Sequence, residues 1–421
     1  MRQNTGWRRL ITGCGWSTAV LVFLIAVLLA WNWQQVRVLP PLFADILAEP
    51  EYATGLNTPD DVLAYLQARP DSFALVAYSV AADGTAVDDE YQLWHNPDQP
   101  MPLASTKKIL ILAAYAQAVA ANQLDPDTAV TLAEWDRYHL PGTNGGAHIA
   151  ALTDLGLAVD DAGYALDPTA TVTLSQMVHA MIRFSDSAAP DYLLDLLGEE
   201  AMAQIMVDAG MTPRPLLPHA GMVLTWQNHT QRSLTADMVA ELTALPANEY
   251  AARVWQMQES FLHSEWGEAE RTWRRNDRRP PNPHRLEMAA ANQLDNVGTA
   301  LEYAAIMAGV ASDTFISPEV SAIMRHYLEW PMAFSGNQEA FLALGSKGGS
   351  LAGLLTGATY YVPRDGAFEE QPRVVVLFMR DMPFAAWLRL SETFAQQQFE
   401  REMATNPGFV RQVTAVQMKS Q

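Results

Sequence analysis

The sequence predicts a mixed α/β protein of the α+β type, in which an antiparallel sheet of about five strands carries an inserted all-helical subdomain. β-Rich runs occur only near the two ends of the chain, at about 72–95 and 341–379. Residues between about 105 and 340 are rich in Ala, Leu and Met, which favour helices. Helical segments also flank the strands at both ends, so both chain ends should build the sheet, with a cleft where it meets the subdomain.

The first predicted element is a membrane helix at residues 10–36. This segment contains no charged side chain and is long enough to span a hydrocarbon core of about 30 Å. Arg2, Arg8 and Arg9 precede it, whereas only Arg37 follows closely, so the positive-inside rule predicts a cytoplasmic N-terminus at 1–9 and a single-pass cell-membrane protein. A cleaved secretory signal is the alternative, but the apolar run is long and "LLAWNW" lacks a small-x-small cleavage site.

Cap, turn and strand signals then define the order of the remaining elements. Four prolines and glycines in 37–57 indicate a linker, and "TPDDVLAYLQARP" has the Thr cap, early acids and Pro stop of a short helix. "SFALVAYSV" and "DEYQLWH" flank the turn "AADGT" as a hairpin. Three strands, "FLALGSKGGS", "LLTGATYYV" and "RVVVLFM", precede an amphipathic helix, so the domain is expected at 58–405, followed by a C-terminal tail at 406–421.

One stretch differs in composition from the rest of this acidic chain. Within a predicted insertion at about 245–290, "ERTWRRNDRRPPNPHR" concentrates six arginines and three prolines. It is either an exposed, solvated insertion or a contact for anionic lipid headgroups or an anionic wall polymer.

Composition excludes several classes of function. The formal net charge of -20 disfavours nucleic acid as a partner. The only cysteine is Cys14, so the outer domain has no disulfide. The histidines form no metal-binding pattern and no phosphate-binding loop is present, so we predict no metal and no cofactor. The oligomeric state stays open.

Lysine is scarce in this chain and therefore informative. Only four of the 27 basic residues are lysine, at positions 107, 108, 347 and 419. Arginine stays protonated in proteins, whereas a desolvated lysine can lose its proton and act as a base. Lys108 and Lys347 are therefore candidates for proton transfer.

Ser105 and Lys108 lie three positions apart in "PLASTKK" and would share one face of a helix that starts at Ser105. Burial and a second cation such as Lys347 would lower the pKa of Lys108 and favour the free amine that activates a serine hydroxyl. Backbone N–H groups at the helix start would favour an oxyanion. The alternative for an isolated S-x-x-K is an N-cap serine followed by a surface lysine.

Two further motifs decide between these interpretations. "IRFSDSAAP" supplies Ser185-Asp186-Ser187, and "LGSKGGS" supplies Lys347-Gly348-Gly349-Ser350 on a predicted strand. Together with S-x-x-K they stand in the chain order of a serine-lysine set. The sequence resembles the penicillin-recognising serine hydrolases, most closely the class A β-lactamases, over about residues 58–405. The resemblance implies a β-lactamase/transpeptidase-like fold.

The resemblance also implies roles for the individual residues. Ser105 would be the acylated nucleophile and Lys108 its general base. Ser185 would pass a proton to the leaving nitrogen, and Lys347 would hold the substrate carboxylate. The backbone N–H groups of Ser105 and Ser350 would form the oxyanion hole. Gly349, lacking a Cβ, would let the strand edge approach the substrate.

The chain departs from the family pattern at three places. Ser187 replaces the Asn of S-D-N, and Gly348 replaces the Thr of K-T-G. Class A β-lactamases remove the acyl group with a water activated by a Glu about 35 residues after S-D-N, but "LLPHAGMVLTWQNHT" contains no carboxylate. Glu287, in "HRLEMAAAN", is the one substitute considered, although Asn292 follows it by five positions and the family spacing is four; otherwise Glu287 is a helix-surface acid.

These observations leave three functions open. The preferred one is a membrane-anchored serine hydrolase that cleaves a β-lactam or related amide through a Ser105 acyl-enzyme. The second is a D,D-peptidase that acts on a peptide derived from peptidoglycan and releases β-lactams slowly. The third is a catalytically weak sensor or wall-binding domain, which two lysines at the motif positions of so lysine-poor a chain disfavour.

Overall fold

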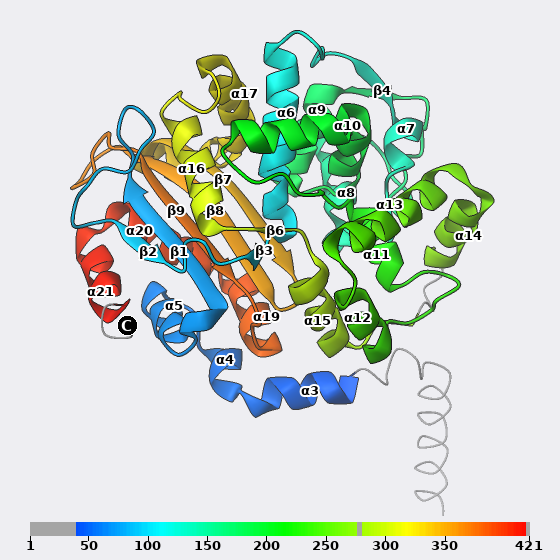
Figure 1. The fold of residues 1–421 in the computed structure, drawn as a ribbon, viewed down its shortest axis with the longest axis horizontal. Coiled ribbons are helices and arrows are strands. Elements are labelled where there is room, and N and C mark those ends of the chain that lie inside the picture. Colours follow the sequence, from blue (N-terminus) through cyan, green and yellow to red (C-terminus); the bar gives the residue numbers. More distant parts are fainter. Residues whose placement is uncertain (1–38, 276–279, 418–421) are drawn as a thin grey trace, which may run out of the picture.

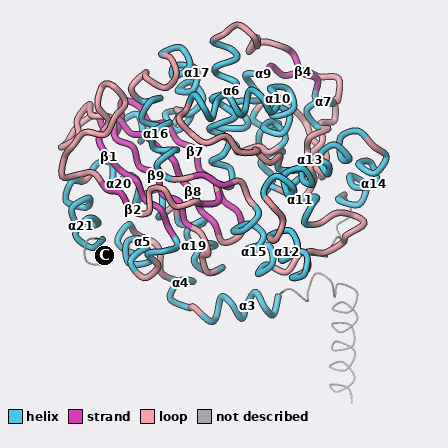
Figure 2. The backbone as a smooth tube through the Cα atoms, viewed as in Figure 1, coloured by secondary structure: helices cyan, strands magenta, loops and turns pink. Residues whose placement is uncertain are grey.

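The computed structural model describes residues 39–275 and 280–417 (Figures 1 and 2). Within these ranges no helix is both long enough and apolar enough to cross a membrane. The membrane helix expected at 10–36 and the N-terminus at 1–9 lie outside the described residues.

A five-stranded antiparallel sheet forms the centre of the domain, as the sequence predicts (Figure 1). Its strands, in the spatial order β2-β1-β9-β8-β7, are β1 (Phe73–Ser79), β2 (Leu93–His95), β7 (Phe341–Leu351), β8 (Leu354–Pro363) and β9 (Arg373–Met379). The N-terminal hairpin pairs with the last strand of the chain, since Val76 opposes Val376 across β1 and β9. β7 lies at the edge that faces the helical subdomain (Figure 2).

The sheet is covered by helices on both faces because successive side chains of a strand point to opposite sides. In β9, Val374, Val376 and Phe378 pack into the core shared with the helical subdomain. Val375 and Leu377 pack on the other face, against the terminal helices. Burying each such side chain contributes about 1.5–3 kcal/mol, so apolar residues occupy every position of this strand after Arg373.

The terminal helices cover the second face. They are α5 (Pro59–Gln67), α19 (Phe384–Thr393), α20 (Ala395–Thr405) and α21 (Pro407–Gln417). The predicted Thr cap is confirmed, since Thr58 and Asp61 form a reciprocal capping box at the start of α5.

Between β2 and β7 the chain forms the predicted run of helices, although this subdomain also contains two short strand pairs and so is not entirely helical. Its helices are α6 (Lys108–Ala120), α7 (Leu132–Asp136), α8 (Ala147–Asp154), α9 (Leu174–His179), α10 (Ala188–Asp208), α11 (His219–Trp226), α12 (Ala236–Thr243), α13 (Ala247–His263), α14 (Glu265–Arg274), α15 (His284–Leu294), α16 (Ala300–Ala311), α17 (Pro318–Leu328) and α18 (Ser335–Ala340). Two short strand pairs join it, β3 (Met101–Pro102) with β6 (Val297–Gly298) and β4 (Ala129–Thr131) with β5 (Thr171–Thr173).

The segment expected as a linker at 37–57 is helical in its described part. It forms α3 (Leu39–Ala48) and α4 (Pro50–Thr54), and both contact α19. Prolines mark these helix starts because the first turn of a helix has no partner for the missing N–H. Asp45 of α3 binds His284 and Arg285 at the start of α15, and the hydrogen bonds, led by Arg285, lower the pKa of Asp45 to about 2.

Two other expectations are corrected. The tail expected at 406–421 is helical to residue 417, and Phe409, Val410 and Val413 of α21 are buried in the core beneath the sheet. The arginine-rich stretch is not simply a solvated insertion, because α14 contributes buried arginines. Arg274 donates to Glu270 Oε1 at 2.7 Å and to Gln227 O at 2.8 Å.

Candidate active site

Ser105 lies in a 3-10 turn, Ala104–Lys107, that leads directly into α6. The sequence predicted a helix that starts at Ser105, whereas the α-helical part begins at Lys108. Ala104 has φ 47°, a left-handed conformation that alanine rarely adopts and that a surrounding structure must enforce. The N-cap positions are Leu103 for the turn and Lys107 for α6, so Ser105 lies inside the turn and is not the N-cap of either element.

The side chain of Lys108 joins the first two motifs. Its Nζ lies 3.0 Å from Ser105 Oγ, 3.1 Å from Ser185 Oγ and 2.6 Å from Ser185 O. Ser185 follows a π-helical turn, Ala180–Phe184, and its φ of 60° directs both of its oxygens toward the amine. π-Turns are frequent at functional sites because they displace the backbone locally.

Lys347 of β7 completes this arrangement from the sheet side. Its Nζ donates to Ser185 Oγ at 3.0 Å and to Gly348 O at 2.7 Å, so Ser185 bridges the two lysines. Burial lowers the pKa of Lys347 to about 7. Burial, reinforced by the charge of Lys347, holds the pKa of Lys108 well below its usual value. For both amines the lowered pKa favours the neutral form relative to an exposed lysine.

The strand edge at Gly349 lies against the nucleophile turn, whereas the sequence predicted that this glycine would admit the substrate. A Cβ at this position would lie 2.6 Å from Ser105 N and 2.9 Å from Leu103 O, so only glycine fits. Ser350 follows on the same edge strand and receives a hydrogen bond from Trp387 Nε1 at 3.0 Å. The backbone of β7 and the Ser105 turn therefore meet where an oxyanion hole needs two N–H donors.

A buried ion-pair network positions the second motif. His148 Nδ1 is 3.0 Å from Asp186 Oδ1, and His148 Nε2 is 3.0 Å from Asp136 Oδ1. Although burial alone would lower it, these two carboxylates raise the pKa of His148 to about 9. Asp186 also accepts from Ala189 N at 2.6 Å, which ties the loop to the start of α10. His148 thus fixes the loop that presents Ser185 and Ser187.

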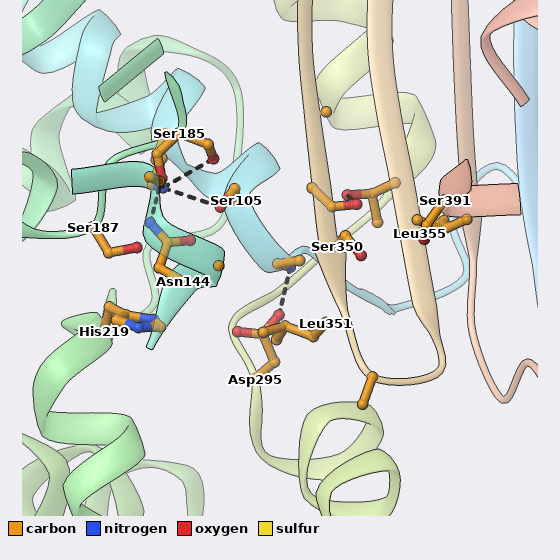
Figure 3. Close-up of a pocket in the computed structure, with 18 of the residues that line it drawn as sticks. Ser105, Asn144, Ser185, Ser187, His219, Asp295, Ser350, Leu351, Leu355 and Ser391 are labelled. Carbon is orange, nitrogen blue, oxygen red and sulfur yellow. Dashed lines mark hydrogen bonds between the residues drawn. The ribbon is translucent and has the colours of Figure 1, made fainter. Parts of the chain in front are cut away.

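Residues from all three motifs line one cavity of about 930 Å³ between the sheet edge and the helical subdomain. Figure 3 shows Ser105, Ser185 and Ser187 on the helical side of this pocket and Ser350 on the strand side. Of the predicted site residues, Ser105, Lys108, Ser185, Ser187, Glu287, Gly349 and Ser350 all line it, and Lys347 reaches it through Ser185.

Glu287 lies on α15, at the wall of the same pocket. Its carboxylate accepts a hydrogen bond from Asn282 Nδ2 at 3.2 Å. Asn292, the possible partner one turn later, instead donates to Met288 O and accepts from Asp381 N. Both ends of the Asn292 amide are thus engaged by backbone groups of Met288 and Asp381.

The structure adds three residues that the sequence analysis did not select: Asn144, His219 and Asp295. Asn144, in the turn "GTNGG", donates to Ser185 O at 2.8 Å, so this turn belongs to the site wall. Asp295 Oδ2 accepts from Ala104 N at 2.5 Å, and His219 lines the pocket from the start of α11. The carboxylate-free stretch that raised the question of deacylation contains His219, but a search for carboxylates alone passed over it.

The geometry of these side chains defines a class of enzyme. A serine hydroxyl touches a buried lysine amine at a helix start, with a second lysine and glycine on a facing strand edge, as a lysine-activated serine hydrolase requires. A model of the β-lactamase enzyme family matches residues 71–354, so the chain belongs to that family and is a serine hydrolase that acts on amide bonds. This confirms the predicted resemblance to penicillin-recognising serine hydrolases.

Solved structures with a similar arrangement include β-lactamases and a penicillin-binding protein. A β-lactamase from Sphaerobacter thermophilus is 17% identical, with a TM-score of 0.44 over 81% of this chain and 96% of its own. A mutant of PBP-A, solved as an acyl-enzyme complex with penicillin G, is 12% identical, with a TM-score of 0.43 over 86% and 96%. A β-lactamase from Francisella tularensis is 13% identical, with a TM-score of 0.40 over 86% and 98%. No curated protein sequence matches the chain.

Proposed function

We propose that this protein cleaves a β-lactam or a related amide through an ester on Ser105, with Lys108 as the general base. The observation that carries this proposal is the 3.0 Å contact between Lys108 Nζ and Ser105 Oγ at a buried position. A neutral amine has two N–H donors and one lone pair. It donates to Ser185 O while its lone pair takes the proton of the Ser105 hydroxyl.

The remaining steps follow from the positions of Ser185 and Lys347. Attack of Ser105 Oγ on the carbonyl carbon places negative charge on its oxygen, near the backbone N–H groups of Ser105 and Ser350. The proton held by Lys108 passes through Ser185 Oγ, 3.1 Å away, to the leaving nitrogen. Lys347 keeps Ser185 oriented and supplies positive charge for a substrate carboxylate.

The D,D-peptidase alternative shares this acylation chemistry and differs in the lifetime of the ester. It is favoured by one observation, the absence of a carboxylate from residues 216–230. A sensor that only binds ligand is disfavoured by the direct contacts of Lys108 with both serines, because recognition alone does not require a lysine base against a serine hydroxyl.

Intact-mass spectrometry of the full chain with benzylpenicillin tests the proposal. We expect one added penicillin mass in the wild-type protein and none in Ser105→Ala. A transient adduct with turnover indicates a β-lactamase, and a persistent adduct indicates the peptidase. No adduct on the wild-type protein would refute both.

We further propose that residues 10–36 anchor the enzyme in the cell membrane with the hydrolase domain outside. The uncharged segment and the preceding arginines support this. So do Phe43 and Leu47 of α3, four positions apart and 57% and 74% exposed, on the helix that follows the segment. The full chain should stay with membranes in alkaline carbonate, and a chain lacking residues 1–38 should not. Release of the full chain by carbonate would contradict the anchor.

A further inference from the structure

The pocket wall beside Ser105 carries a buried carboxylate that acylation does not use. Asp295, just after α15, is 6% exposed, and its Oδ2 accepts from Ala104 N, one residue before the nucleophile. Its Oδ1 is buried and makes no hydrogen bond of standard geometry among the described residues, although Asn296 also lies against this carboxylate and lowers its pKa. A buried carboxylate oxygen without a good hydrogen bond is unfavourable, so its retention at a pocket wall points to a ligand.

A second unpaired group faces the same pocket. His219 is the first residue of α11, and its Nε2 is buried without a partner in the described part of the chain. Asp191 fixes this helix start, because its two oxygens accept from His219 N and Ala220 N at 2.7 and 2.8 Å. Figure 3 shows His219 and Asp295 on the walls of the pocket that also contains Ser105.

Both groups can accept a hydrogen bond from the same water molecule. Burial, together with the charges of Lys107 and Lys108, lowers the pKa of His219 to about 3, so the ring is neutral near pH 7. A neutral imidazole protonated on Nδ1 offers Nε2 as an acceptor. A water that donates one hydrogen to Nε2 and the other to Asp295 Oδ1 keeps its lone pairs for attack.

The charge of Lys107 partly offsets the effect of burial on the pKa of Asp295. Its Nζ is buried and donates to Leu217 O at 2.6 Å. Burial raises the pKa of Asp295, and the charge of Lys107 is the largest influence opposing that rise. Lys107 therefore favours the ionised carboxylate that a general base requires.

We propose that Asp295 and His219 hold and activate the water that hydrolyses the acyl-enzyme, with Asp295 as general base and His219 as the second acceptor. The proposal rests on acylation of Ser105. It assigns deacylation to groups other than Glu287, with the histidine supplied by the segment that lacks a carboxylate and the base supplied by a residue far downstream.

The step is a balanced ester hydrolysis. The water oxygen bonds to the ester carbon while one water proton passes to Asp295 Oδ1, and the carbonyl electrons move to the oxyanion. The carbon–oxygen bond to Ser105 then breaks as the carbonyl re-forms. Ser105 Oγ takes the proton back from Asp295, and the acid product leaves and loses its own proton to solvent.

Single-turnover intact-mass kinetics with benzylpenicillin separate acylation from release. Asp295→Asn keeps an amide oxygen for Ala104 N but cannot take a proton. We expect acylation within about threefold of wild type and release slower by about 10²- to 10⁴-fold. His219→Leu should slow release by about 10-fold, and His219→Gln, which restores an acceptor, should recover part of that loss. Should Asp295→Asn fail to fold, the two His219 variants decide the question.

Four outcomes overturn the inference in distinguishable ways. Release at the wild-type rate in Asp295→Asn and His219→Leu removes both roles. If Glu287→Gln accumulates the acyl-enzyme while Asp295→Asn releases it at the wild-type rate, the general base is Glu287. A wild-type adduct that never clears refutes water activation but leaves acylation of Ser105 intact. No wild-type adduct refutes the proposed function itself.

Discussion

Substitution of Gly349 by alanine tests the oxyanion geometry most directly. The added Cβ would lie 2.6 Å from Ser105 N and 2.9 Å from Leu103 O, and both are backbone atoms that cannot rotate away. Because ordinary contact begins at 3.4 Å, the strand and the nucleophile turn must separate by about 1 Å. The same shift moves the two N–H donors apart.

A displacement of about 1 Å at a reacting centre costs on the order of 100-fold in rate, which equals about 2.7 kcal/mol of activation free energy. We therefore expect Gly349→Ala to acylate with benzylpenicillin about 100-fold more slowly than wild type. Overpacking should also destabilise the fold by about 1–3 kcal/mol. Gly348→Ala is the matched control, since its Cβ would meet only Thr356 O, at 3.4 Å.

The assay is the rate of adduct formation by intact mass, with thermal unfolding measured in parallel. Gly348→Ala should acylate within about threefold of wild type. If Gly349→Ala acylates as fast as Gly348→Ala, the close approach of β7 to Ser105 does not set the geometry of the oxyanion hole, and the reasoning fails.

The remaining predictions concern the lysines and His148. Lys108→Arg should reduce acylation by about 10²- to 10⁴-fold because arginine does not lose its proton, and near-wild-type acylation would exclude Lys108 as the base. The second-order rate constant for acylation should fall at low pH, because Lys108 gains a proton. It should fall again above about pH 7, because Lys347, whose pKa is about 7, loses the charge that holds the substrate carboxylate. Lys347→Gln should abolish the upper decline, and a flat profile in the wild type would contradict both assignments. His148→Gln should lower the free energy of unfolding by about 3–5 kcal/mol, since it leaves Asp136 and Asp186 without their cation. The pKa of His148 is raised from 6.5 to about 9, so its stabilisation is complete below pH 6.5 and is lost as pH rises to about 9. Denaturant unfolding at several pH values should therefore show the largest difference near pH 6, and an equal difference at all pH values would show that the charge of His148 is not the cause.

Much of the fold was predictable because its signals are local. The hairpin, the three C-terminal strands and the capped helix at Thr58 each carry their own turn, alternation or cap residues. The three motifs were equally visible, because the chemistry restricts the spacing of Ser105 and Lys108 to one helical turn.

The missed features depend on contacts between distant segments. Prolines in 37–57 suggested a linker, but proline also starts helices, and the contacts of α3 with α19 and of Asp45 with α15 show that α3 docks on the domain. Asp295 and His219 follow no motif. The turn at Ala104 and the fixed start of α11 bring them to Ser105, and neither is encoded by a spacing in the sequence.

The distribution of lysine gives the folded chain an unusual pattern of protease sensitivity. Within the described residues the lysines are Lys107, Lys108 and Lys347, which are 3%, 1% and 4% exposed and surround the nucleophile. A lysine-specific endoprotease therefore cuts this part of the chain only when the catalytic centre itself opens. Its cleavage rate reports the free energy of that local opening, and a covalent acyl group that bridges the two lobes should slow it while leaving cleavage after the abundant surface arginines unchanged.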